Sequence, residues 1–267
     1  MDAFNRLKEN LAAYDKVAVA YSGGVDSSFL MAVAVEVLGA ENVLGIYAEN
    51  GLNPRRDRFD AYVLAEMMGW QVKVAEVALM EDDDVVANDV NRCYFCKRKT
   101  FAAAKAFAEE EGYEVLLDGT NVDDLSDHRP GFKALEELGV GSPLKDAGIT
   151  KDLVRKLSKR EYDLPTWNKP SNSCLATRIP YGTPLTKEAL HLVEEGESYL
   201  HELGYLTCRL RLHGDVARVE IPVADFQKFM LNHREDVAAY FKELGITYTA
   251  LDVVGFRSGS GNEGLDR

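Results

Sequence analysis

The 267-residue sequence predicts an α/β protein, in which a parallel sheet flanked by helices is followed by a smaller C-terminal α+β domain. Two observations predict the first part: short apolar runs alternate with helical segments, and several of these runs end in polar turns. A third predicts the second part, because past about residue 184 the pattern changes to a helix followed by two neighbouring strands. We therefore expect domains at 1–183 and 184–257, with a flexible tail at 258–267.

The elements of the first domain follow from the spacing of its apolar residues. They are expected to alternate as helix 4–14, strand 17–21, helix 27–38, strand 43–48, helix 54–68, strand 71–77, a loop or short helix at 81–92, helix 97–111 and strand 115–117. Such alternation predicts a parallel sheet covered by helices on both faces. Ligands of such sheets lie at the carboxyl ends of the strands.

The second domain shows a different order. We expect a helix at 186–203, strands at 206–213 and 216–221, helices within 223–244 and a final strand at 248–256. The segment 128–181 links the two domains. This order is typical of a small α+β unit.

Composition narrows the function classes. No apolar stretch approaches the ~20 residues needed to cross a bilayer, so we expect no membrane partner. The N-terminus lacks the apolar core of a signal peptide, which favours a cytoplasmic protein. The net charge of −13 opposes binding to nucleic acid, which usually requires a basic surface. Four cysteines are too few for a disulfide scaffold in a chain of this length, and in a reducing compartment they favour metal binding or chemistry.

The most informative segment is the turn at 22–28, Ser-Gly-Gly-Val-Asp-Ser-Ser, between the first strand and its helix. Two glycines let the backbone approach a ligand, and the amides of a first helical turn favour an anion. The hydroxyls of Ser22, Ser27 and Ser28 add donors, and Asp26 offers an oxygen ligand to the Mg²⁺ that accompanies phosphates. A plain strand-to-helix turn needs only one capping residue.

The lysine of a kinase-type P-loop is missing from this turn. The turn instead resembles the SGGxDS pyrophosphate loop of the N-type ATP pyrophosphatases. These enzymes cleave ATP between its α- and β-phosphates.

A second polar turn, at 118–124, follows the fourth strand and is expected to converge with the first at the edge of the sheet. Asn121, Asp123 and Asp124 supply the hard oxygen atoms that Mg²⁺ prefers. The alternative is a turn in which these side chains only cap the next segment. Together, the two turns favour a nucleotide and magnesium site.

Cys93 and Cys96 form a Cys-x-x-Cys pair with Arg92, Lys97 and Arg98 around it. A redox dithiol, half of a zinc site and ligands of an iron–sulfur cluster all use this spacing. A zinc site needs a second pair, whereas a pair with one distant cysteine fits a [4Fe–4S] cluster with one open iron. The structural alternative is two buried cysteines one helical turn apart.

The distant cysteine is Cys174, in an irregular segment that contains Pro170 and Pro180. Lys169 and Arg178 place cations near it in the sequence. Cations stabilise the thiolate, which is the form that acts as a nucleophile or metal ligand. An isolated cysteine is more often a core residue, but these polar surroundings favour a functional thiol.

Taken together, these motifs resemble the LarE family of ATP-dependent sulfur transferases, which build the nickel-pincer nucleotide cofactor. The resemblance is carried by the segments 22–28, 47–51, 92–97, 119–124 and 169–182, and it extends over essentially the whole chain. It implies a fold like that of the adenine nucleotide alpha hydrolases, ATP and Mg²⁺ as cofactors, and a homo-oligomer.

The resemblance also implies the chemistry. ATP adenylates a carboxylate of pyridinium-3,5-biscarboxylic acid mononucleotide, and sulfur then displaces AMP to give a thiocarboxylate. In members with a single cysteine, the residue corresponding to Cys174 donates its own sulfur. Members with three cysteines hold a [4Fe–4S] cluster, so Cys93 and Cys96 imply this second type, with a sulfide or other sulfur donor as a partner.

Individual roles follow from the same resemblance. Catalysis is assigned to Cys174 and Asp26, and the cluster to Cys93, Cys96 and Cys174. ATP or pyrophosphate is assigned to Ser22, Gly23, Gly24, Asp26, Ser27, Ser28, Glu49, Gly119, Asn121 and Arg178. The substrate phosphate is assigned to Arg209 and Arg211, whose alternation on a strand also fits a solvent-facing basic surface. Metal ions are assigned to Asp26, Asp123 and Asp124, and to Glu197 and Asp225.

Three other functions are compatible with the turn at 22–28, which we call the phosphate turn. A synthetase of the GMP or NAD synthetase type adenylates its substrate but attacks with ammonia, and it needs no group of cysteines. A tRNA-thiolating enzyme also uses cluster cysteines, although the net charge of −13 opposes that function. A nucleotide-sensing module would release neither AMP nor pyrophosphate.

Overall fold

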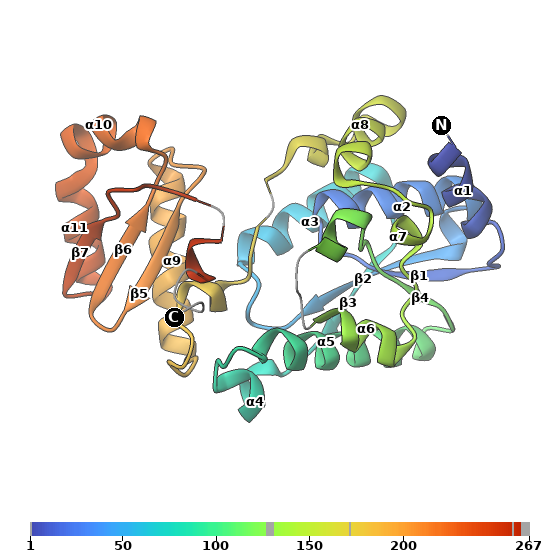
Figure 1. Cartoon of the computed structure of the whole chain (residues 1–267), viewed down its shortest axis with the longest axis horizontal. Coiled ribbons are helices and arrows are strands. Elements are labelled where there is room, and N and C mark those ends of the chain that lie inside the picture. Colours follow the sequence, from blue (N-terminus) through green and yellow to red (C-terminus); the bar gives the residue numbers. More distant parts are fainter. Residues whose placement is uncertain (1, 127–130, 171, 258, 263–267) are drawn as a thin grey trace. The chain divides into compact units, whose positions relative to one another are not determined.

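The computed structural model describes residues 2–126, 131–170, 172–257 and 259–262 (Figure 1). The chain forms two compact units, residues 1–82 with 91–172 and residues 83–90 with 173–267. The division therefore falls at 172/173 instead of the expected 183/184. The segment 83–90 belongs to the second unit, where Asn88 Nδ2 donates to the carbonyl oxygens of Pro180 and Thr183.

A four-stranded parallel sheet forms the centre of the first unit, in the order β3-β2-β1-β4. The strands are β1 (Val17–Ala20), β2 (Val43–Glu49), β3 (Val72–Glu76) and β4 (Leu116–Leu117). Strands β2 and β3 lie on one side of β1, and β4 lies on the other side of β1. The turns after β1 and β4 therefore meet at a topological switch point, and the sheet confirms the predicted fold class.

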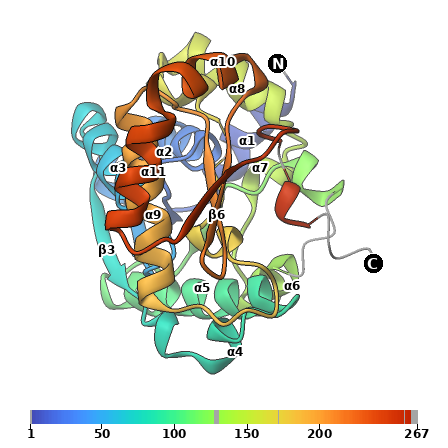
Figure 2. The same ribbon diagram turned by 90° about the vertical axis from the view of Figure 1, so that its left-hand side faces the viewer.

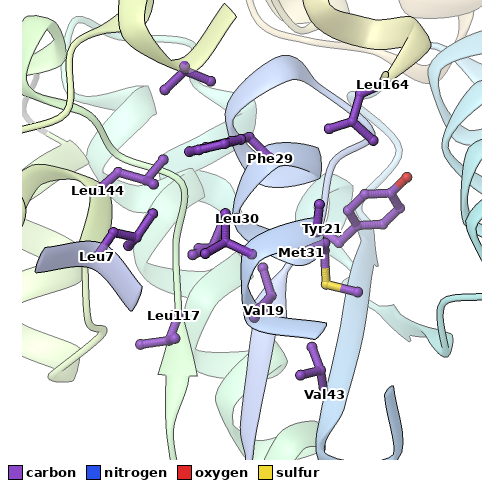
Figure 3. Packing of buried hydrophobic residues seen from close by; sticks show 14 of the residues in the cluster. Leu7, Val19, Tyr21, Phe29, Leu30, Met31, Val43, Leu117, Leu144 and Leu164 are labelled. Carbon is purple, nitrogen blue, oxygen red and sulfur yellow. The ribbon is translucent and has the colours of Figure 1, made fainter. Parts of the chain in front are cut away.

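Two apolar cores cover the two faces of this sheet. Val17 and Val19 belong to one core and Ala18 to the other, because successive strand residues point to opposite faces. The first core includes side chains of α1 (Asp2–Leu11), α2 (Val25–Leu38), α3 (Arg55–Met68), α7 (Pro143–Asp146) and α8 (Lys151–Tyr162), and Figure 3 shows part of it. The second includes side chains of α5 (Arg92–Glu110) and α6 (Gly131–Leu138).

The second unit contains a three-stranded sheet in the order β5-β6-β7. β5 (Arg209–His213) is antiparallel to β6 (Val216–Glu220), and β7 (Tyr248–Leu251) is parallel to β6. The helices are α4 (Asp83–Val86), α9 (Lys187–Glu202), α10 (Phe226–Lys228) and α11 (Arg234–Glu243). Helices α9 and α11 pack against the sheet and against each other (Figure 2). Gly196 permits this approach, since a Cβ there would lie 2.3 Å from Leu210 Cδ1.

Short helical turns complete both units. They are η1 (Ala40–Asn42), η2 (Leu79–Glu81), η3 (Val122–Ser126), η4 (Pro165–Asn168), η5 (Leu175–Arg178), η6 (Val223–Asp225), η8 (Ser260–Asn262) and the π-helical η7 (Phe229–His233). Across the described part of the chain, every helix is too short or too polar to cross a membrane.

Further expectations differ from the structure. The helix expected from residue 97 begins at Arg92, since the segment 92–96 contains no glycine or proline to interrupt it. The last strand ends at Leu251, because the following residues turn at Gly255, whose φ is 80°. In the expected tail, Ser260 is buried within η8; residues 258 and 263–267 lie outside the described residues.

Candidate functional site

The turn between β1 and α2 is shaped by glycine and closed by hydroxyls. Gly23 has a φ of 68°, and a Cβ on it would lie 2.6 Å from Ala61 Cβ, so a side chain does not fit. The Oγ atoms of Ser22 and Ser27 lie 3.1 Å apart and tie the turn together. Among the described residues, no side chain caps the N-terminus of α2, which begins after Gly24. The amides of the first turn of α2 are therefore available to an anion.

The turn after β4 packs directly against the first turn of α2. A Cβ on Gly119 would lie 2.9 Å from the amide nitrogen of Ser27, so this position also requires glycine. Asn121 Nδ2 donates to Asp26 Oδ1 at 3.3 Å, and the Asn121 amide donates to Asp124 Oδ2 at 3.1 Å. The structure thus brings the predicted phosphate and magnesium residues of both turns together.

Lys151, the first residue of α8, is a site residue that the sequence interpretation missed. Its ammonium group pairs with the Asp26 carboxylate, and its amide donates to Asp123 Oδ2 at 2.7 Å. Burial raises the pKa of Asp26, and the charge of Lys151 partly offsets that rise. A lysine in a first helical turn opposes the helix dipole, which is a signal that could have identified it. Thr150 fixes this start of α8 by accepting from the Leu153 amide at 3.3 Å.

Glu49 lies at the carboxyl end of β2, the strand next to β1. Arg58 Nη1 lies 3.0 Å from Glu49 Oε2, and both side chains are partly exposed. Glu49 therefore stands at the predicted edge of the sheet, in a surface ion pair. Its contact with ATP stays a prediction.

The Cys-x-x-Cys pair lies in the first two turns of α5. Residues three positions apart lie on the same side of a helix, so the two thiols share one face. Cys93 is exposed, Cys96 is half-buried, and neither is in a disulfide. Arg92 Nη2 lies 3.9 Å from Cys93 Sγ, and the Arg98 guanidinium lies over the Tyr94 ring.

The chemistry of these two thiols fits two ligands of the expected cluster. The third expected ligand, Cys174, belongs to the second unit. Among the residues that the structure describes, no group of three or more His, Cys, Asp or Glu side chains is placed to hold a metal ion. The cluster therefore stays a prediction, as do the metal roles of Glu197 and Asp225.

In the second unit, Cys174 precedes η5, and Arg178 at the end of that turn holds it in place. The buried Arg178 side chain pairs with Glu197 through Nε at 2.8 Å and Nη2 at 2.9 Å. Its third nitrogen, Nη1, donates to the carbonyl oxygens of Ser173 and Cys174 at 2.8 and 3.1 Å. Burial opposes the positive charge, but Glu197 outweighs it and raises the pKa of Arg178.

These contacts give Arg178 and Glu197 a structural role that their sequence positions did not indicate. Each side-chain nitrogen of Arg178 is engaged inside the protein, and Glu197 Oε1 also accepts from the Leu210 amide at 2.9 Å. The pair supports the Cys174 loop. Contact of Arg178 with ATP stays a prediction.

The two arginines expected to bind the substrate phosphate have different surroundings. Arg211 is buried, and its three side-chain nitrogens contact Glu220, Thr177 and Ser260 at 2.7, 2.7 and 2.6 Å. All of its donor nitrogens are therefore engaged by the protein itself. Arg211 is poorly placed to receive a ligand without giving up one of these bonds.

Arg209 is half-buried and more available. Its Nη1 donates to the Cys208 carbonyl oxygen at 2.6 Å, and its guanidinium carbon lies 5.3 Å from the centre of the Phe256 ring. Burial, and next the charge of Arg178, lower the pKa of Arg209. Within the described chain no carboxylate forms an ion pair with it. A cation in positive surroundings is stabilised by an anion, so Arg209 suits a phosphate better than Arg211.

Known proteins share this organisation. A family model described as NAD synthase matches residues 3–125. The chain is 36% identical over 252 residues to the pyridinium-3,5-bisthiocarboxylic acid mononucleotide synthase of Lactiplantibacillus plantarum, over 94% of this chain and 91% of that protein. It is 36% identical over 262 residues to an uncharacterised protein of Synechocystis, over 98% and 97% of the two chains. It is also 29% identical over 215 residues to a glutamine-hydrolysing GMP synthase chain of Thermoplasma volcanium, over 72% and 66%.

Proposed function

The chain belongs to the LarE family, and we propose that it is an ATP-dependent sulfur transferase acting on pyridinium-3,5-biscarboxylic acid mononucleotide in nickel-pincer nucleotide biosynthesis. The product carries thiocarboxylates, as the name of the L. plantarum relative states for that protein. One observation carries the proposal: this chain combines a phosphate turn with a thiol in a supported loop. In the turn Asp26 pairs with Lys151, and in the loop the buried Arg178 holds the backbone of Cys174.

The first proposed step is adenylation. A carboxylate oxygen of the substrate attacks the α-phosphorus of ATP, the bond from that phosphorus to the bridging oxygen of the β-phosphate breaks, and pyrophosphate leaves. The amides of the first turn of α2 and the Lys151 ammonium would stabilise the charge on the leaving group. Asp26 and Asp124 would hold Mg²⁺, which neutralises phosphate charge when bound. Lys151 would leave the Asp26 carboxylate to reach the phosphates.

The second proposed step is sulfur transfer. A sulfur nucleophile attacks the acyl carbon, and AMP leaves with the electron pair of the broken carbon–oxygen bond. If the Cys174 thiolate attacks, the product keeps the sulfur only after β-elimination, in which a base removes the Cα proton and the Cβ–Sγ bond breaks with its electron pair on the thiocarboxylate, leaving dehydroalanine at that position. We propose the other route, in which Cys93, Cys96 and Cys174 hold a [4Fe–4S] cluster that, when bound, supplies a replaceable sulfide renewed by an external sulfur donor.

Binding of the substrate phosphate is proposed for Arg209, because Arg211 is already engaged. Arg209→Gln is expected to raise the KM for the substrate about tenfold, as charge-assisted hydrogen bonds contribute roughly 1.5–3 kcal/mol. Arg234→Gln changes an exposed arginine of the same unit and serves as the control. We also propose that the chain forms a homo-oligomer, which light scattering would test.

An ammonia-using synthetase is the second candidate, because the NAD synthase model matches the phosphate-binding part of the chain. The two are separated by incubating anaerobically purified protein with ATP, Mg²⁺, the mononucleotide and either sulfide or ammonium. Mass spectrometry is expected to find a thiocarboxylate with sulfide, together with one AMP and one pyrophosphate for each carboxylate. An amide formed only with ammonium would overturn the sulfur transferase.

The cluster is tested separately by iron and acid-labile sulfide analysis of the anaerobic protein. Cys93→Ser and Cys96→Ser are expected to lose the iron, whereas Cys208→Ala, at a buried cysteine outside the proposed ligand set, retains it. Iron retained after either α5 substitution would defeat the cluster. A single turnover that leaves dehydroalanine at Cys174 would show that the thiol is consumed instead.

A further inference from the structure

Residues 259–262 reach a buried ion pair of the second unit. Ser260, in η8, is only 6% exposed. Its Oγ lies 2.6 Å from Arg211 Nη2 and 2.9 Å from Glu220 Oε2, while Arg211 Nε lies 2.7 Å from Glu220 Oε1. The Ser260 hydroxyl therefore accepts from the cation and donates to the anion. It fixes both partners at once.

Arg211 connects this network to residues 173–178 around Cys174, which we call the thiol loop. Its Nη1 donates to the Thr177 carbonyl oxygen at 2.7 Å. Thr177 in turn donates to the Cys174 carbonyl oxygen from its amide at 3.1 Å and from its hydroxyl at 2.8 Å. A continuous route of hydrogen bonds therefore runs from Ser260 through Arg211 and Thr177 to the backbone of Cys174.

Gly261 provides the space for this contact. A Cβ at this position would lie 2.9 Å from Arg211 Nη1 and 3.3 Å from Thr177 O, the two atoms of the bond that holds the loop. The Arg211 guanidinium can move aside only by giving up hydrogen bonds, because each of its nitrogens is engaged. A methyl group here would push the guanidinium away from Thr177.

The thiol loop needs support of this kind because η5 is a short 3₁₀ turn. Arg178 holds the Cys174 carbonyl at the start of this turn, and Arg211 holds the Thr177 carbonyl near its end. The two arginines pair with different carboxylates, but Arg178 Nη1 also donates to Thr177 Oγ1 at 2.9 Å, so both of them hold Thr177. Loss of the bond from Arg211 would leave the Thr177 carbonyl oxygen without this donor, while the contacts of Arg178 remain.

We propose that Ser260 and Gly261 are positioning residues for the Cys174 thiol. The segment 259–262 keeps Arg211 against Thr177, and this contact sets the direction and exposure of the thiol. The inference rests on the proposed function only in that Cys174 takes part in sulfur transfer. Within the described chain, the C-terminal segment is accordingly a component of the thiol site.

The first test measures the rate at which each cysteine reacts with iodoacetamide, resolved by peptide mass spectrometry in the reduced, metal-free protein. Ser260→Ala and Gly261→Ala are expected to accelerate alkylation of Cys174 at least about threefold, because local opening exposes the thiol. Cys93, in the first unit, is an internal standard whose rate stays unchanged. Ser260→Thr keeps the hydroxyl and should restore the rate, and Ser198→Ala is the matched control on α9.

Equal Cys174 rates in the wild type, Ser260→Ala and Gly261→Ala would overturn the inference. So would a rise at Cys208, which is buried in the second unit, of the same size as at Cys174, because it would report general destabilisation of that unit. Thermal unfolding of each variant is measured alongside, and Gly261→Ala is informative if Ser260→Ala fails to fold. This test needs no substrate, so its outcome is independent of the proposed reaction.

The second test asks whether the effect reaches catalysis. In Ser260→Ala, the exchange of pyrophosphate into ATP in the presence of the mononucleotide is expected to stay unchanged, while kcat for thiocarboxylate formation falls about tenfold, since small misplacements of a reacting group are costly. An equal loss in both assays would overturn a positioning role for the thiol. If the wild type formed no thiocarboxylate, the proposed function would fail while the alkylation result would still stand.

Discussion

The phosphate turn of the first unit and the thiol loop of the second are built in different ways. The phosphate turn is shaped by backbone: Gly23 and Gly119 remove side chains where segments touch, and the amides of α2 remain available. The thiol loop is shaped by buried charge, because Arg178 and Arg211 hold its carbonyl groups. A ligand that brings several negative charges needs donors left open. A small thiol that must point in one direction needs its backbone held by donors that are fully used.

This difference predicts different consequences of substitution. In the phosphate turn, a change of shape should reduce ligand binding while the fold survives. In the thiol loop, removal of one charged partner should threaten the fold, because the other charge is left buried and unpaired. The following experiments test this contrast, from the largest expected effect to the smallest.

Arg178→Met should produce the largest loss of stability. It leaves the nearly buried Glu197 carboxylate without its cation, and breaking a buried pair costs about 3–5 kcal/mol. Urea unfolding, followed by a spectroscopic probe in the second unit, measures the change in the free energy of unfolding. Arg234→Met, at an exposed pair, is expected to cost less than about 1 kcal/mol.

The double variant Arg178→Met with Glu197→Leu sharpens this test. Replacing both members removes the unpaired charge, so much of the lost stability should return. A double variant as unstable as Arg178→Met alone would show that packing, and not the buried charge, dominates this part of the protein.

Gly119→Ala should affect the ligand more than the fold. The added methyl group meets the Ser27 amide and separates the two turns of the first unit, so exchange of pyrophosphate into ATP should fall about 100-fold. Alkylation of Cys174 in the second unit should keep its wild-type rate. Retention of most of the exchange activity would contradict the role given to this close contact.

Lys151→Gln should weaken ATP binding about tenfold, which is the effect of losing one charge-assisted hydrogen bond. The pairing of Lys151 with Asp26 places its ammonium group beside the phosphate turn. Lys156→Gln changes an exposed lysine of the same helix, paired with Asp152, and serves as the control. Equal KM values for ATP in the two variants would show that Lys151 does not contribute to ATP binding.

Asp26 should give a smaller effect, which depends on pH. Its pKa is raised chiefly by burial, so the folded protein retains this proton to a higher pH than the unfolded chain does. The unfolding free energy should therefore decrease as pH rises from the ordinary pKa of Asp through the higher folded value. Asp26→Asn should remove this slope in urea titrations without Mg²⁺. An unchanged slope would show that other groups cause it.

The two sites also differ in how much of them the sequence could predict. The place of the phosphate turn between a strand and a helix was predicted correctly, because its glycines and hydroxyls lie within seven consecutive residues. Its binding of phosphate stays a prediction. Lys151 was missed, since it stands 125 positions from the Asp26 carboxylate that it contacts. The helix predicted at 97–111 also begins too late, since α5 begins at Arg92 and includes the thiol pair, which the prediction left outside any element.

The thiol loop shows the same limit more strongly. Cys174 was identified from its polar neighbours, but the bond from Arg211 to Thr177 spans 34 positions and that from Arg211 to Ser260 spans 49. The expected tail around Ser260 contains only small and polar residues after Arg257 as far as Gly264, a composition that does not reveal burial. Its buried state depends on the charged partners that the fold places beside it.

The sequence by itself determined the alternation of strands and helices, the phosphate turn and the presence of three candidate thiols, because these depend on residues that are neighbours in the chain. Only the tertiary structure decided which charges are used internally and which remain available. Arg209 and Arg211 illustrate this, since they lie two positions apart on one strand. Arg211 is engaged by Glu220, Thr177 and Ser260, whereas Arg209 can still bind an anion. The physical reason is that hydrogen-bonding partners are set by distance in space, which sequence separation does not reveal.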